Sequence, residues 1–107
     1  LTLQAIAAML LIDDEVLDYA VRIVRATGDW SGIQLGAGPR ATVALVRAAR
    51  GHALLSGRGY VIPDDVKTMV HAVLRHRIKL GADLEIDGVT PDDVLAELAR
   101  NVLAPRR

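Results

Sequence analysis

The chain has 107 residues, 51% of them hydrophobic, which suits one globular domain with a modest core and excludes two. It carries 13 basic and 13 acidic residues, and this zero net charge argues against a nucleic-acid-binding domain with a basic face. The lack of cysteine excludes disulfides, thiol nucleophiles and Cys-based zinc sites, and the longest apolar run, residues 5–12, is too short to cross a membrane. With an aromatic share of only 3%, the core must be built from small aliphatic residues, which favours an all-α domain.

Apolar residues at helical spacing predict that residues 1–12 are the end of a preceding helix or a linker, within a longer protein. Asp13 and Asp14 form an acidic start for the next helix, which Gly28 ends. Asp18 and Arg22, four residues apart, are expected to pair on its solvent side. Its predicted buried face consists of Val16, Leu17, Ala20, Val21, Ile23 and Val24.

Residues 28–38 are glycine-rich and without helical period, so they predict a loop. The following helix runs from Pro39 to about Ser56, and at about 100° per residue its arginines Arg40, Arg47 and Arg50 share one polar stripe. Pro39 suits the first helical position, where no backbone donor is lost. Arg40 lies in the first turn, where free N–H groups and the helix dipole favour an anion.

The second half predicts a helix that begins at Pro63 and a last helix that begins at Thr90. Thr90 and Asp93 have the spacing of a capping box. Between the helices, residues 77–87 alternate in hydropathy and predict a short hairpin or an extended connection. Residues 13–104 are therefore predicted to form one small helical bundle. Its predicted buried residues in this half are Val66, Met69, Val70, Val73, Leu74, Val94, Leu95, Leu98 and Val102.

No catalytic constellation is visible in the sequence. It contains no Walker A loop, no Gly-x-Ser-x-Gly elbow and no His-Glu-x-x-His metal site. His71 and His76 are five residues apart, which turns them away from each other on a helix, so no metal site is predicted. The acidic pairs at 13–14, 64–65 and 92–93 are explained by the dipoles of the helices that they start, and residues 75–77 by a solvated helix end.

Several segments resemble, in order, the C-terminal helical lid of MoxR-type AAA+ ATPases. Residues 36–41 read Gly36-Ala37-Gly38-Pro39-Arg40-Ala41, where that family typically has Gly-Ala-Ser-Pro-Arg-Ala. Residues 57–66 read GRGYVIPDDV and residues 73–77 read VLRHR, and both are similar to later family motifs. The stretches VLDY at 16–19 and VRAT at 24–27 are similar to the preceding lid helix. The resemblance covers nearly the whole chain.

The resemblance implies a role for Arg40 as the sensor 2 arginine, presented by Pro39 to the terminal phosphates of ATP. It also implies ATP and Mg²⁺ bound by the parent protein, with an upstream α/β nucleotide-binding domain and a homo-oligomeric ring in the cytoplasm. Chaperone-like work on partner proteins, including proteins with von Willebrand A domains, is implied as well. The parent protein would be the ATP hydrolase, and these 107 residues alone would not hydrolyse or retain the nucleotide.

The chain departs from the family pattern at Gly28, Gly38, Gly59 and Ile62. Gly38 in place of Ser is expected to loosen the presentation of Arg40, and Ile62 in place of Thr to remove about 1 kcal/mol of helix capping. Two alternatives remain open on the residues alone. One is a free-standing helical interaction or adaptor module with a solvated arginine stripe, and the other is a small DNA-binding domain, which the zero net charge disfavours.

Overall fold

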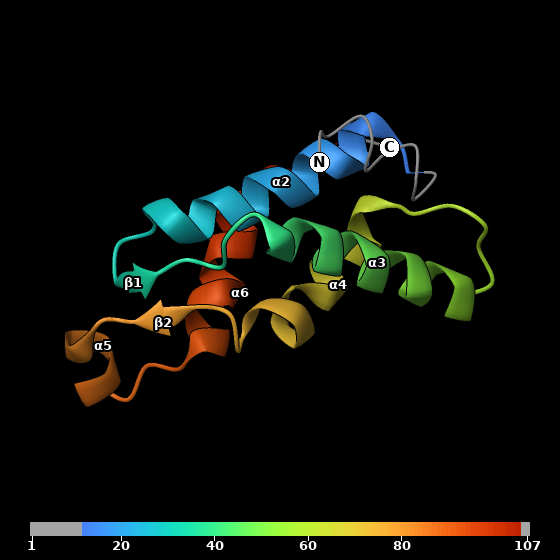
Figure 1. The fold of residues 1–107 in the computed structure, drawn as a ribbon. Coiled ribbons are helices and arrows are strands. Elements are labelled where there is room, and N and C mark those ends of the chain that lie inside the picture. The colour runs from blue at the N-terminus through green and yellow to red at the C-terminus, as the bar shows by residue number, and fades with distance from the viewer. Residues whose placement is uncertain (1–11, 106–107) are drawn as a thin grey trace.

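The computed structural model describes residues 12–105 and has the predicted all-α architecture (Figure 1). The helices are α2 (Asp14–Asp29), α3 (Arg40–Leu55), α4 (Pro63–Leu74), α5 (Ala82–Ile86) and α6 (Pro91–Asn101). Two short strands, β1 (Ile33–Leu35) and β2 (Lys79–Leu80), form the sheet of the described region. The helix or linker predicted for residues 1–12 lies outside the described residues except for Ile12, which is buried. No helix within residues 12–105 combines the length and apolar character that crossing a bilayer requires.

Helix α2 begins and packs as its sequence predicts. The Asp13 carboxylate accepts a hydrogen bond from the Glu15 amide at 2.9 Å, which satisfies one of the free N–H groups of the first turn. The expected Asp18–Arg22 ion pair is present at 2.9 Å. All six apolar residues predicted for its inner face are buried, and so is Tyr19. Burial raises the pKa of the Tyr19 hydroxyl, which the nearby Arg22 partly opposes.

The core lies where α2, α3, α4 and α6 meet. Helices α3 and α4 pack most extensively against each other, and α2 and α6 both contact α4 (Figure 1). The predicted inner faces of α4 and α6 are largely correct, but Met69, Val73 and Val102 are only partly buried at the edge of the core. Fully buried members of this core include Ile23, Leu45, Val46, Val66, Val70, Leu74, Leu95 and Leu98.

Of the two alternatives predicted for residues 77–87, the short hairpin is wrong, whereas the extended connection is confirmed at Lys79–Leu80, which form β2. Strand β2 pairs antiparallel with β1, Leu80 opposite Ile33, and β1 lies in the segment predicted as a loop. Residues 82–86 form the helical turn α5 rather than a second hairpin arm. Leu80 is buried, and its partner belongs to a strand that is distant in the sequence rather than to a neighbouring one. Local periodicity contains no information on such a partner.

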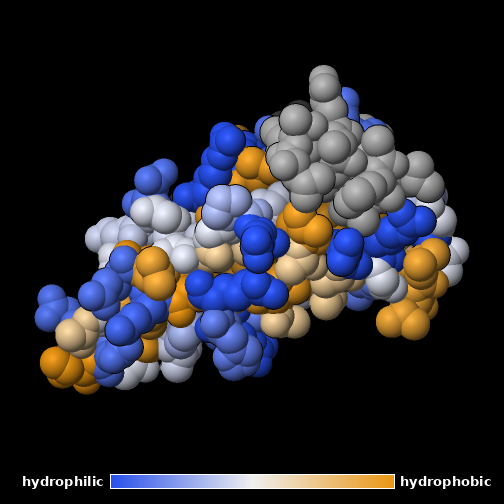
Figure 2. All heavy atoms as spheres, in the orientation of Figure 1, coloured by the Kyte–Doolittle hydropathy of each residue, from blue (hydrophilic) through white to orange (hydrophobic). Residues whose placement is uncertain are grey.

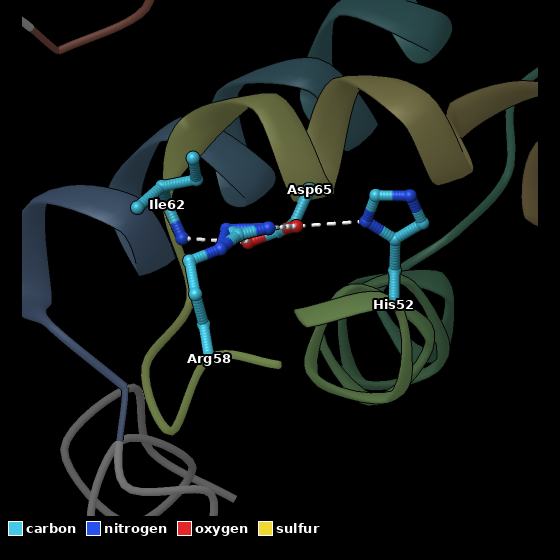
Figure 3. Close-up of polar contacts among 4 residues, drawn as sticks. All are labelled: His52, Arg58, Ile62 and Asp65. Carbon is cyan, nitrogen blue, oxygen red and sulfur yellow. Dashed lines mark hydrogen bonds and ion pairs between the residues drawn. The ribbon is translucent and has the colours of Figure 1, made fainter. Parts of the chain in front are cut away.

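The start of α4 is held by a buried carboxylate, that of Asp65 (Figure 3). Its Oδ1 lies 2.7 Å from Nδ1 of His52 on α3 and 2.5 Å from a guanidinium nitrogen of Arg58 in the connecting loop. Its Oδ2 accepts from the other Arg58 nitrogen at 3.1 Å and from the Ile62 amide at 2.8 Å. One side chain therefore joins the end of α3, the loop and the first turn of α4.

This arrangement corrects the dipole explanation of the acidic pair at 64–65. Asp64 is exposed and fits that explanation, whereas Asp65 has no exposed side-chain surface and is fully hydrogen-bonded. Ile62 provides no side-chain cap, as expected, but its own amide is satisfied by Asp65, so half of a capping box remains. The sequence pattern did not reveal that the second carboxylate of the pair turns inward.

Helix α6 has the complete capping box predicted for Thr90 and Asp93. The Thr90 amide donates to the Asp93 carboxylate at 3.0 Å, and the Asp93 amide donates to the Thr90 hydroxyl at 3.2 Å. The backbone hydrogen bond from Thr90 lowers the pKa of Asp93. Beside it, Asp92 lies 3.1 Å from Nδ1 of His71 and so links the start of α6 to α4.

We expect Asp65→Ala to lower the free energy of unfolding by about 3 kcal/mol. This is the low end for removing one partner of a buried ion pair, because Arg58 and His52 keep 22% and 35% of their side-chain surface exposed. Urea denaturation followed by circular dichroism measures the change. The matched control is Asp64→Ala, on the same helix turn but exposed, for which the loss should stay below about 1 kcal/mol. Equal losses in the two variants would contradict the role of Asp65.

We expect Asp93→Ala to destabilise the chain at pH 7 and this destabilisation to shrink in acid. The folded-state pKa of Asp93 is lowered, so its stabilising contribution is complete above the ordinary carboxyl pKa of 3.8. It is lost as the pH falls through the lower, folded-state value. Melting temperatures of wild type and variant from pH 7 to pH 2 test this, and a gap that stays constant over that range would refute it.

Candidate functional site

A groove of about 610 Å³ separates the second half of α2 from the beginning of α3. In Figure 1 the segment that leaves β1 runs back beside α2 before α3 begins. Two residues of this segment, Gly38 and Pro39, line the groove. The apolar part of the lining comes from both helices, and two arginines lie on it. The lining residues are Val21, Val24, Arg25, Thr27, Gly28, Gly38, Pro39, Arg40, Thr42 and Val43.

Both predicted site residues, Pro39 and Arg40, lie in this groove. Pro39 has helical dihedrals, φ −63° and ψ −33°, and immediately precedes α3, close to its predicted place in the first turn. Arg40 is exposed, and within the described part of the chain its guanidinium makes no hydrogen bond or ion pair. The first turn of α3 contains no acidic residue and no side-chain cap. The positive end of the helix dipole and a free guanidinium thus face the same groove.

The rest of the predicted arginine stripe lies away from the groove. Arg47 is exposed farther along α3, and Arg50 is half-buried beside a small crevice near the connecting loop. Sequence reasoning assigned no function to Arg25, yet this residue of α2 lines the same groove as Arg40. Its position two residues before Thr27, in the stretch that resembles the family, was the available signal.

The turn before Arg40 requires a glycine at position 38. Gly38 has a φ of +83°, a left-handed conformation that side chains with a Cβ rarely adopt. Its carbonyl accepts a hydrogen bond from the Ala41 amide at 3.2 Å, so it helps to begin α3. Glycine is therefore well suited to this turn, and the expected loosening of Arg40 stays a prediction.

The same segment is attached to the end of α2. Thr27 is completely buried, and its hydroxyl donates to the Val24 carbonyl at 2.6 Å and accepts from the Ala37 amide at 3.0 Å. A Cβ on Gly36 would lie 2.8 Å from backbone atoms of Gly28, so only a glycine permits this approach. The contact between the end of α2 and this segment was not predicted, because residues 28–38 indicate only a loop without assigned contacts.

The lining of the groove combines cationic and apolar side chains. Its two guanidinium groups suit a phosphate or carboxylate, and its valine wall suits a flat apolar group. None of its lining residues is a carboxylate, histidine or lysine that would serve as a general base. Across residues 12–105, no three His, Cys, Asp or Glu side chains come together as a metal site would require.

Comparison with known proteins identifies the family to which this arrangement belongs. The family model described as the AAA lid domain matches residues 25–98. The chaperone MoxR1 of Mycobacterium tuberculosis is 38% identical over 115 aligned positions, which cover 99% of this chain and 30% of MoxR1. The protein YeaC of Bacillus subtilis is 37% identical over 93 residues, which cover 87% of this chain and 29% of YeaC.

A solved structure extends this similarity from sequence to fold. It is described as a candidate ATPase from Cytophaga hutchinsonii, is 29% identical, and superposes with a TM-score of 0.81. The match covers 89% of this chain and 32% of that protein. The chain thus spans about a third or less of the relatives that it matches. With the family model, the relatives and the fold in agreement, this chain belongs to the AAA lid domain family and is a lid of the MoxR-like AAA+ ATPase kind.

Proposed function

We propose that this lid supplies a sensor 2 arginine, Arg40, to the nucleotide site of a MoxR-like AAA+ ATPase. Pro39 fixes the backbone from which the side chain leaves. The rest of the site, with the phosphate-binding loop and the residues that hold Mg²⁺, belongs in this proposal to an α/β domain of the same protein. ATP would lie between that domain and the groove, with its terminal phosphates toward Arg40.

The observation that carries the proposal is the free guanidinium of Arg40 at the start of α3. An arginine without an ion-pair partner, on a groove wall without carboxylates, keeps its full capacity to bind an anion. Bonds between guanidinium and phosphate oxygens are charge-assisted and often bidentate. They weaken when the γ-phosphate leaves, so that the lid is released after hydrolysis. The chain thereby converts a change of bound nucleotide into a rotation of the lid.

The wider activity proposed here follows from the relatives. One of them is named a chaperone, and two others carry the name MoxR. We extend to this protein a homo-oligomeric ring and chaperone-like remodelling or maturation of partner proteins, including von Willebrand A domain proteins. Because the parent ATPase would consume ATP, we place it in the cytoplasm.

A second candidate function, a helical interaction or adaptor module, is favoured by the exposed apolar side chains at the end of α3. Leu54 and Leu55 are 60% and 91% exposed, and hydrophobic atoms appear at this end of the molecule in Figure 2. Such residues are typical of contacts with other proteins. The coding sequence upstream of these residues distinguishes the two functions, since only the ATPase requires a Gly-x-x-x-x-Gly-Lys-Ser/Thr loop.

In the complete protein, we expect Arg40→Ala to lower the kcat of ATP hydrolysis by about a hundredfold while some nucleotide binding remains. Steady-state hydrolysis and equilibrium binding of a fluorescent ATP analogue measure the two effects. Arg40→Lys should recover only part of the loss, because lysine cannot bind two phosphate oxygens in the planar manner of arginine. Arg47→Ala, an exposed arginine of the same helix outside the groove, is the matched control and should behave as wild type. Full turnover by Arg40→Ala would exclude the sensor role.

We also expect the 107-residue chain alone to show no ATP hydrolysis. Its groove provides cations and an apolar wall but neither a base nor a metal-binding residue. A phosphate-release assay at high protein concentration tests this, with the Arg40→Ala chain purified in parallel to measure contaminating activity. Phosphate release above that of the control would contradict the proposal that hydrolysis requires the α/β domain.

A further inference from the structure

We propose that Thr27 is the positioning residue for Arg40: its buried hydroxyl fixes the Gly36–Pro39 segment against α2 and so sets where the guanidinium enters the groove. The inference rests on the proposed function of Arg40 and adds a residue on a different helix to that function. Thr27 itself touches no substrate in this proposal. It acts through the backbone that precedes α3.

The hydrogen bonds of Thr27 have a direction that suits this role. The hydroxyl has one proton, which it donates to the Val24 carbonyl at 2.6 Å, as threonine often does within its own helix. Its oxygen is thereby left to accept from the Ala37 amide at 3.0 Å. That amide belongs to the segment between β1 and α3, and the bond spans two elements. Because Thr27 has no exposed surface, water cannot replace it there.

A second, independent contact holds the same segment. Gly36 lies so close to the end of α2 that a Cβ would meet the Cα and N of Gly28 at 2.8 Å and the carbonyl carbon of Thr27 at 3.0 Å. All three atoms are backbone, so they cannot move aside as a flexible side chain would. A hydrogen bond at Ala37 and close packing at Gly36 therefore hold the Gly36–Pro39 segment against α2.

The position of Arg40 depends on these contacts because no other residue in the described region holds its side chain. Its guanidinium has no ion-pair or hydrogen-bond partner among residues 12–105, so the direction of the backbone decides where it points. Between Ala37 and Arg40 stand only Gly38 and Pro39, and the ring of Pro39 fixes one of the dihedrals. Because only these two residues separate them, we expect a shift at Ala37 to move the backbone at Arg40, although Gly38 adds freedom at one position. Displacements of about 1 Å in a catalytic arrangement can lower a rate by about a hundredfold.

The test compares Thr27→Val, which keeps the shape and removes the hydroxyl, with Thr27→Ser, which keeps the hydroxyl, both in the complete protein. We expect Thr27→Val to lower kcat by about tenfold to a hundredfold with a smaller change in KM, and Thr27→Ser to retain most of the activity. Melting temperatures establish that both variants are folded. Hydrogen–deuterium exchange of the peptide that contains Ala37 should be faster in Thr27→Val alone.

A double-mutant cycle with Arg40→Ala separates positioning from general support of the fold. If Thr27 acts through Arg40, Thr27→Val has no further effect on kcat once Arg40 is absent. Should Thr27→Val prove too unstable to purify, Gly36→Ala displaces the segment from its other contact and should give the same loss and the same non-additivity.

The outcomes distinguish this inference from the function on which it rests. Normal turnover in Arg40→Ala would overturn both. Impaired turnover in Arg40→Ala together with normal turnover in Thr27→Val would overturn only the positioning role of Thr27. Additive losses in the double variant would overturn it as well, because they would show that Thr27 acts independently of the guanidinium.

Discussion

The packing of this lid depends on one buried carboxylate. Asp65 uses both oxygens to join α3, the connecting loop and α4, and these two helices form the most extensive contact of the fold. A charge in this position is tolerated because Arg58 and the backbone surround it with donors. The valine and leucine core packs around these hydrogen bonds, which are directional whereas aliphatic contacts are not.

A second joint, between α2 and the segment before α3, has a different character. It contains no charge and consists of a hydroxyl, an amide and a glycine that lies against backbone. The contacts of Asp65 therefore fix α3 against α4. The contacts of Thr27 and Gly36 fix the segment that leads into the N-terminus of α3. Arg40 lies at the end of this sequence of constraints, exposed and without a partner of its own in the described region. The contacts at Gly36 and Ala37 fix the backbone that leads to Arg40, whose own side chain has no partner within residues 12–105.

The helices and their buried faces were predictable because spacing and capping patterns depend on residues that are close in the sequence. The amphipathic pattern of α2, the capping box of α6 and the place of Pro39 and Arg40 at the start of α3 all agree with the structure. Contacts between distant segments were not predictable in the same way. The pairing of β1 with β2, the inward turn of Asp65 and the bond from Thr27 to Ala37 each join elements whose relative placement depends on the packed core. The resemblance to MoxR-type lids indicated Arg40 as a candidate site residue. It did not indicate which residues hold the segment before Arg40 in place.

The two-stranded ladder has a consequence for the order in which the chain acquires its structure. We expect Ile33 and Leu80 to pair only after both intervening helices are formed, because closing a long flexible loop costs entropy that local helix formation does not. We therefore expect the pairing between the strands to be a late event in folding. Since β1 leads directly into the segment before Arg40, we expect a newly synthesised chain to complete its hydrophobic interior first and the edge that carries Arg40 last.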